Sequence, residues 1–188
     1  MKDYIIDQLK ELSDQLLILT QQAEQIKEIA DVCTKAILAR RKIIFCGNGG
    51  SAAQSQHLAA ELVGRYRKDR PALQAISLTV DTSNITAIGN DYGFDYIFSR
   101  QLRGVGRKGD ILIGLSTSGE SKNVIRAFKK AQRMGIKTVA LIGEKDGMMK
   151  FLSDYCIQVP ATTSAHIQEM HIAVGHLICD LVERAVYG

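Results

Sequence analysis

The chain has 188 residues, of which 46% are apolar and 23% charged, a composition that suits a buried core and excludes disorder as the overall state. The net charge is only +4, with basic residues spread along the chain, so charge does not predict nucleic acid as a partner. No run of about 18 apolar residues predicts a membrane span, and the N-terminus lacks a signal-peptide pattern. One short basic cluster is expected to be a solvated loop: Arg65, Arg67, Lys68 and Arg70.

The four cysteines lie in apolar stretches and show no CxxC spacing. This pattern predicts buried free thiols and fits a reducing cytoplasm.

Residues 4–39 carry apolar side chains at alternating spacings of four and three. The members of this stripe are Ile5, Leu9, Leu12, Leu16, Leu19, Ala23, Ile26, Ala30, Cys33 and Ile37. A heptad pattern of this length predicts one long helix. Because a small domain cannot easily cover the whole stripe, we expect 1–40 to be an oligomerisation helix that packs on both the body and a partner chain. The remaining residues, 41–188, would form the main domain.

Beyond residue 42, short apolar runs alternate with helical patterns. Strands are predicted at 43–46, 75–78, 110–115, 137–143 and 155–159. Helices are predicted at 52–66, 83–90, 95–106, 121–134, 147–152 and 165–186. Continuous apolar strands between helices are typical of a parallel sheet that is covered on both faces. The sequence therefore predicts a single α/β domain with a five-stranded parallel sheet in a flavodoxin-like, three-layer arrangement.

Two loops that follow predicted strands are suited to phosphate. Residues 47–51 read Gly-Asn-Gly-Gly-Ser, and residues 116–121 read Ser-Thr-Ser-Gly-Glu-Ser. Glycines let the backbone approach a ligand, and hydroxyls beside a helix N-terminus attract anions. Neither loop matches the dinucleotide or Walker pattern. Helix capping with turn glycines is the alternative, and it explains one such loop better than two.

The ionisable residues are less decisive on spacing alone. His57 and Glu61 are four residues apart, so they share one face of a predicted helix. Three of the four histidines lie on the last predicted helix, where a lone histidine is more often packed or exposed than a ligand. The pair Asn90 and Asp91 is more typical of a turn than of a site.

Taken together, the motifs resemble those of the phosphoheptose isomerases. The matching segments are 46–51, 57–66, 89–94, 116–121 and 167–171, and they extend from the first strand to the last helix. The serine loop alone would indicate only a sugar isomerase (SIS) domain. The resemblance implies an enzyme that converts sedoheptulose 7-phosphate to D-glycero-D-manno-heptose 7-phosphate, the entry to bacterial surface heptose synthesis. It also implies a cytoplasmic homotetramer with active sites at subunit interfaces and one zinc ion per subunit.

The resemblance assigns a role to each matching residue. The implied substrate loop is Asn48, Gly49 and Gly50, together with Asn90 and Asp91. The implied phosphate cradle is Ser116, Thr117, Ser118 and Ser121. The implied zinc ligands are His57, Glu61, Gln168 and His176, of which Glu61 and Gln168 would also contact substrate. Glu61 and His176 are the implied catalytic pair.

The chemistry fits these residue types. Isomerisation through an enediol needs a base that moves a proton between C1 and C2, here Glu61, and a partner that moves protons between O1 and O2, here His176. Zinc would act as a Lewis acid on the substrate oxygens. Because a carboxylate committed to zinc is a poorer base, Glu61 would alternate between the two roles, or the metal would mainly organise the site.

One spacing raises a question about the zinc ligands. Gln168 and His176 are eight residues apart, about 12 Å along a continuous helix. Either Gln168 lies in an irregular first turn, or the two residues come from different chains, which is the option we favour.

Two alternatives use the same fold. The first is a non-enzymatic SIS tetramer that binds the bacterial replication initiator, but that branch is expected to lack an acid at Glu61 and a histidine at His176. The second is an arabinose 5-phosphate isomerase, whose extra regulatory domains would not fit in 188 residues. The sequence leaves open whether the heptose enters lipopolysaccharide, capsule or another product, and which metal is bound.

Overall fold

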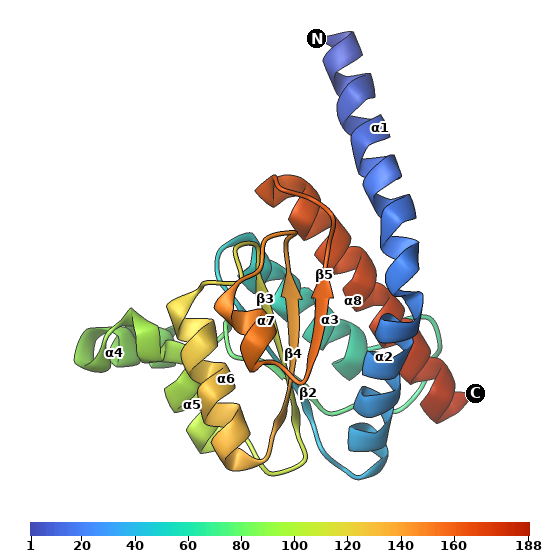
Figure 1. Cartoon of the computed structure of the whole chain (residues 1–188). Coiled ribbons are helices and arrows are strands. Elements are labelled where there is room, and N and C mark those ends of the chain that lie inside the picture. Colours follow the sequence, from blue (N-terminus) through green and yellow to red (C-terminus); the bar gives the residue numbers. More distant parts are fainter.

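A five-stranded sheet forms the centre of the computed structural model, which describes residues 1–188 (Figure 1). The strands are β1 (Ile43–Gly47), β2 (Ala75–Ser77), β3 (Ile111–Ser116), β4 (Lys137–Ile142) and β5 (Tyr155–Gln158). Their order is β2-β1-β3-β4-β5, and every neighbouring pair is parallel. The predicted parallel sheet is confirmed, with each strand end within one residue of its expected position.

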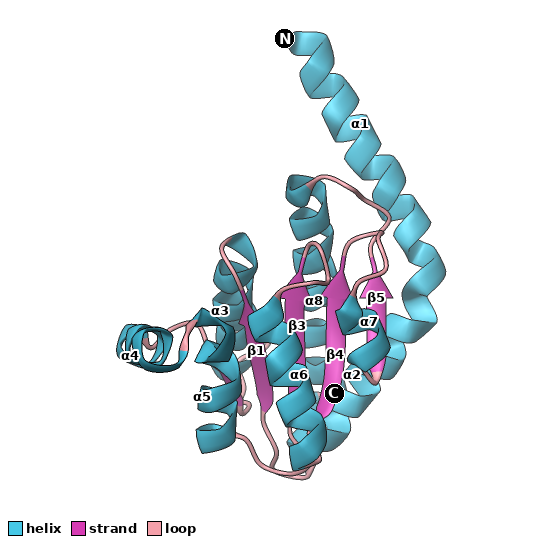
Figure 2. Cartoon of the chain, turned by 60° about the vertical axis from the view of Figure 1, so that its left-hand side comes forward, coloured by secondary structure: helices cyan, strands magenta, loops and turns pink.

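Helices cover both faces of the sheet (Figure 2). They are α1 (Lys2–Leu19), α2 (Ala23–Leu38), α3 (Gly50–Val63), α4 (Thr82–Tyr92), α5 (Ile97–Val105), α6 (Lys122–Met134), α7 (Met148–Leu152) and α8 (Ser164–Tyr187). Side chains of α2, α3 and α8 form the core on one face, and side chains of α5, α6 and α7 form the core on the other. The three-layer architecture is therefore confirmed.

The central strands bury both of their faces. Ile43 and Phe45 of β1 point into the α2–α3–α8 core, while Ile44 and Cys46 point into the α5–α6–α7 core. Successive side chains of a strand alternate between faces, so a strand in the middle layer must be apolar at every position. This explains why the sequence shows continuous apolar runs.

The expected single helix at 4–39 is wrong in one respect, because a 3₁₀ turn at Thr20–Gln22 divides it into α1 and α2. The hydroxyl of Thr20 donates to the carbonyl of Leu17 (2.6 Å), and Gln22 donates its side-chain amide to the carbonyl of Gln158 on β5. Such side-chain bonds to the backbone compete with the regular helical pattern. The heptad spacing continues through the turn and so gave no sign of it.

The two parts of this N-terminal segment have different surroundings. Ile26, Ile29 and Cys33 of α2 are buried in the core, where α2 packs against α8. By contrast, Leu19 is the one buried residue of α1, and this helix projects away from the body (Figure 1). Most of its apolar stripe is therefore left uncovered by its own chain, with Leu12 half-buried and Leu19 buried against the core.

The cysteines are free thiols, as predicted: Cys33, Cys46 and Cys179 are buried, and Cys156 is half-buried. Burial raises the pKa of the Cys33 and Cys46 thiols to about 12, so these thiols stay protonated at neutral pH. No helix is both long and apolar enough to cross a membrane.

Candidate active site

The sheet order places a topological switch point between β1 and β3. These strands are neighbours, with Gly47 paired to Leu115 at their carboxyl ends. The chain leaves β1 towards α3 on one face of the sheet and leaves β3 towards α6 on the other. In open parallel sheets, ligands bind at such a point, where the connections diverge. Both loops that the sequence singled out meet here.

The serine loop gathers three hydroxyl groups at the N-terminus of α6. The Oγ of Ser116 lies 2.9 Å from that of Ser121 and 3.5 Å from that of Ser118. The backbone N–H groups of Gly119 and Glu120 donate to Ser116 and Ser118, respectively. Hydroxyl donors beside a helix N-terminus are groups that can hold an anion, so the phosphate cradle stays a prediction that this geometry allows. Thr117 and Ser118 line an adjoining pocket of about 390 Å³.

A pair of asparagines ties the glycine loop to the serine loop. Asn48 donates its amide to Asn123 Oδ1 (2.9 Å), and Asn123 donates in return to Asn48 Oδ1 (2.8 Å). Asn123 is buried, and its Oδ1 also accepts from the backbone N–H of Val124. Sequence reasoning missed Asn123, although it follows the serine loop by only two residues.

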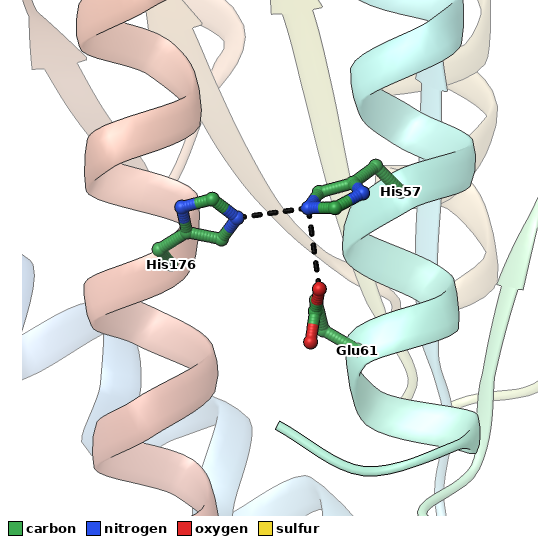
Figure 3. Close-up of side chains that lie close together, drawn as sticks. All are labelled: His57, Glu61 and His176. Carbon is green, nitrogen blue, oxygen red and sulfur yellow. Dashed lines mark hydrogen bonds and ion pairs between the residues drawn. The ribbon is translucent and has the colours of Figure 1, made fainter. Parts of the chain in front are cut away.

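A second cluster joins α3 to α8 (Figure 3). The Nε2 atoms of His57 and His176 are 2.9 Å apart, and His57 Nε2 lies 3.2 Å from a carboxylate oxygen of Glu61. One ligand atom from each of the three residues falls within 4.8 Å of the others. Burial and the neighbouring His57 lower the pKa of His176, and the opposing effect of Glu61 does not compensate. We call these residues the His–Glu–His cluster.

The donor set of the His–Glu–His cluster fits a zinc ion. Two imidazole nitrogens and one carboxylate are the three protein ligands of many catalytic zinc sites. The side chain of His57 is half exposed and that of Glu61 is 21% exposed, so substrate can reach the cluster. The third residue, His176, is brought into range because Gly175 lets α8 lie close to Leu58 of α3, where a methyl group would be 2.5 Å from Leu58 carbons.

Gln168 is not part of this cluster within one chain. Its side-chain amide lies against Gly50, where an added Cβ would be 2.5 Å from Gln168 Oε1, and its carbonyl accepts from Gln54. Because Gln168 lies inside a regular helix, the alternative of an irregular first turn is wrong. Eight helical residues therefore separate it from His176, about 12 Å.

Asn90 and Asp91 also lie apart from the other expected site residues. They occupy the end of α4, where Asn90 donates its amide to Asp91 (2.9 Å). They are therefore helical rather than in a turn. No residue of α4 is buried, and the helix stands out from one edge of the molecule (Figure 1).

The loop after α3 is fixed by a buried carboxylate that sequence reasoning also missed. Glu183 is 1% exposed and accepts from Arg70 Nε (3.0 Å) and from the backbone N–H groups of Tyr66, Arg67 and Lys68. Burial raises the pKa of Glu183, but these hydrogen bonds outweigh burial and lower it to about 2. The expected solvated basic loop is thus wrong for Arg70, whose side chain is 2% exposed.

This anchored loop places an aromatic ring beside the His–Glu–His cluster. The centroids of the Tyr66 and His176 rings are 5.7 Å apart, with an angle of 33° between their planes. The loop therefore forms one wall of the cluster.

The sheet order defines a doubly wound α/β protein whose glycine and serine loops meet at the switch point, and a family model for the SIS domain matches residues 6–143. The phosphoheptose isomerase of Akkermansia muciniphila is 57% identical over 188 residues, all of both chains. A solved phosphoheptose isomerase from Neisseria gonorrhoeae is 39% identical, with a TM-score of 0.92 over 97% of this chain and 98% of that one. That from Francisella tularensis is 32% identical, with a TM-score of 0.93 over 97% of each.

The chain therefore belongs to the SIS-domain family and, within it, to the phosphoheptose isomerases. This confirms both the resemblance seen in the motifs and the prediction of an isomerase.

Proposed function

We propose that the chain interconverts sedoheptulose 7-phosphate and D-glycero-D-manno-heptose 7-phosphate, with the phosphate at the loops that follow β1 and β3 and the catalytic residues on α3 and α8. The observation that carries this proposal is the His–Glu–His cluster, which places one carboxylate and two imidazoles within 4.8 Å in a family of sugar-phosphate isomerases. Proton transfer between neighbouring carbon and oxygen atoms needs groups of these two kinds.

The phosphate is held at the serine loop. Ser116, Ser118 and Ser121 donate hydroxyl hydrogen bonds, with Thr117 beside them, and the N-terminus of α6 supplies its positive end. The backbone at Asn48, Gly49 and Gly50 positions the sugar. Gly49 has φ +56°, a conformation that favours glycine, so this loop can bring its backbone close to the sugar.

Glu61 and His176 carry out the proton transfers. The carboxylate of Glu61 takes the proton from C1 of the ketose and returns it to C2 of the enediol. His176 moves protons between O1 and O2, and its lowered pKa keeps the imidazole neutral at pH 7, so that it can accept the first hydroxyl proton.

One zinc ion per subunit would be held by His57, Glu61 and His176. A zinc ion there supplies Lewis-acid polarisation of the substrate hydroxyl and carbonyl oxygens. Gln168 would complete the ligand set from another chain, since its own chain keeps it at Gly50. Glu61 and His176 would each serve as zinc ligand and as proton-transfer group in turn.

The working assembly would be a homotetramer with active sites at subunit interfaces. Its support is the apolar stripe of α1 and an apolar pocket of about 430 Å³ that α1, α2 and α8 line together. In such an assembly, Asn90 and Asp91 on the projecting helix α4 would contact substrate in the active site of a neighbouring subunit. The enzyme would act in the cytoplasm and supply heptose phosphate to precursors of surface carbohydrates.

Incubation with sedoheptulose 7-phosphate in deuterated water, followed by NMR, tests the reaction. We expect an aldose with deuterium at C2, and we expect it to vanish on chelation and return with zinc. If product still forms in the presence of the chelator, the zinc assignment is contradicted but the assignment of isomerase activity stands. If no product forms even with added zinc, the proposed reaction is wrong and binding to the replication initiator should be measured.

A further inference from the structure

A basic groove of about 320 Å³ runs between α5 and α6. Six cationic side chains line it: Arg100, Arg103, Arg126, Lys129, Lys130 and Arg133. We call it the α5–α6 groove. It belongs to the α5–α6–α7 face of the sheet, whereas the His–Glu–His cluster joins α3 and α8 on the opposite face. It is therefore separate from the proposed zinc and catalytic residues.

The helical spacing of these residues concentrates their charge on one side. On α6, Arg126, Lys129, Lys130 and Arg133 follow the i, i+3, i+4, i+7 pattern, and Arg100 and Arg103 of α5 face them. The opposite sides of the two helices bury apolar residues such as Phe98 and Phe128. Because the groove needs two helices to form, the sequence showed only basic residues spread along the chain.

The positive charge of the α5–α6 groove is almost unneutralised. Arg126 alone among the six has a carboxylate within ion-pair distance, that of Asp95 at 3.7 Å. Six positive charges and one negative leave +5 in the groove, so the rest of a chain with net charge +4 carries −1. Like charges at these helical spacings are destabilising. The groove is therefore costly for the folded chain unless an anion offsets its charge.

Two of the guanidinium groups are already ordered on aromatic rings. Arg100 lies 3.6 Å from the centroid of Tyr92, and Arg126 lies 4.3 Å from that of Tyr96. Stacking limits the motion of a guanidinium and leaves its N–H groups available to phosphate oxygens. The two nearby rings are covered by these cations, so the groove offers phosphate-binding groups rather than a surface for a nucleobase.

We propose that the α5–α6 groove binds a small anion with at least two linked phosphoryl groups. A single phosphate monoester carries only about −1.5 to −2 at pH 7, too little to match the charge of the groove. Arginine forks recognise phosphate oxygens in pairs, and a compact di- or triphosphate fits a groove of about 320 Å³ better than a long nucleic acid does. Recognition would be through the phosphoryl groups, whether inorganic or part of a nucleotide.

Calorimetric titration of the full-length chain with inorganic tripolyphosphate tests this. The groove variant is Arg103→Gln/Lys130→Gln/Arg133→Gln, which spares the stacked arginines. The control, Lys2→Gln/Lys35→Gln/Lys68→Gln, removes the same charge from side chains that make no hydrogen bond or ion pair. We expect the groove variant to bind at least about tenfold more weakly, as loss of charge-assisted hydrogen bonds requires, and the control to bind as the parent does.

Further arms separate the possible outcomes. Adenosine and guanosine triphosphates should bind as tightly as tripolyphosphate, orthophosphate much more weakly, and the groove variant should still isomerise the heptose phosphate. Equal affinity in the groove variant and the parent would overturn the proposal. So would loss of tripolyphosphate binding in Ser116→Ala/Ser121→Ala, which would place the anion at the serine loop. If a short DNA duplex binds more tightly than tripolyphosphate and its binding is lost in the groove variant, the ligand of the groove is nucleic acid and the proposal of a small anion is wrong.

Discussion

Glu61 is the residue on which the proposed chemistry most depends. Replacement by glutamine keeps its shape but removes the base, so we expect Glu61→Gln to lower turnover by about 10²–10⁴-fold, the usual range for a general base. Conversion of sedoheptulose 7-phosphate measures this, with circular dichroism to show an unchanged fold. Glu28→Gln changes an exposed carboxylate on α2 and serves as the control. Near-parental turnover in Glu61→Gln would show that Glu61 is not the base.

Ser121 tests the phosphate cradle separately from the chemistry. Its hydroxyl lies 2.9 Å from that of Ser116 at the N-terminus of α6. Loss of one hydrogen bond to a charged group costs about 1.5–3 kcal/mol, so Ser121→Ala should raise KM by roughly 10- to 100-fold and change kcat less. Steady-state kinetics measures both, with the exposed Ser13→Ala as the control. An unchanged KM would contradict the assignment of Ser121 to phosphate.

Glu183 links stability to pH. Its carboxyl has a pKa of about 2 in the folded chain, below the ordinary value of 4.5. The unfolded chain therefore binds the proton first as the pH falls, so the stabilisation is present above pH 4.5 and is lost between pH 4.5 and 2. Urea unfolding at a series of pH values measures this loss.

The variant Glu183→Gln should lack that part of the pH dependence. At pH 7 it should also be less stable by about 3 kcal/mol, because Arg70 would be left buried without its partner. Equal loss of stability on acidification in variant and parent would assign the effect to other carboxylates.

At the scale of the elements, activity depends on how closely α8 approaches α3. A methyl group on Gly175 would lie 2.5 Å from Leu58 carbons, next to His176. Overpacking of this kind costs about 1–3 kcal/mol, so Gly175→Ala should lower the unfolding free energy and also slow turnover, because it moves His176 away from His57.

Gly104→Ala is a matched control for that substitution, because it also lies in a helix and has nothing within 4 Å of its added methyl group. It should be neutral or stabilising by up to about 1 kcal/mol. Thermal unfolding measures the stability of the two variants, and steady-state kinetics measures their turnover. Equal stability of both would show that α3 and α8 have room to separate.

The helices and strands themselves could be predicted where their local patterns are strong. The central strands are buried on both faces, so their apolar runs were visible, and Gly135 ends α6 in the left-handed conformation where the expected helix ended. The turn at Thr20–Gln22 could not be predicted, because it depends partly on a hydrogen bond to Gln158, 136 positions away. Local periodicity carries no information about such a partner.

At the scale of the whole molecule, the sequence predicted the two polar loops better than the contacts among the site residues. Two loops after parallel strands meet at one edge of a sheet by topology alone. His57 and His176 are 119 positions apart, however, and only the resemblance brought them together before the structure was known. Asn123 and Arg70 were missed for the same reason: their polar partners are distant in sequence, and a buried asparagine or arginine looks like an exposed one until its contacts are known.

The uncovered stripe of α1 makes a prediction about the assembly. Leu9 is 64% exposed and Leu16 is 37% exposed, so Leu9→Lys/Leu16→Lys places two charges where a partner chain would pack. We expect the parent to have four times the chain mass of 20.7 kDa by light scattering, and the variant to be smaller and to lose activity with the interfaces. The control, Asp14→Lys/Gln21→Lys, adds lysines to exposed positions off the stripe and should keep the parental mass. A monomeric parent would contradict the tetramer, and a dissociated variant with full activity would show that each site is complete within one chain.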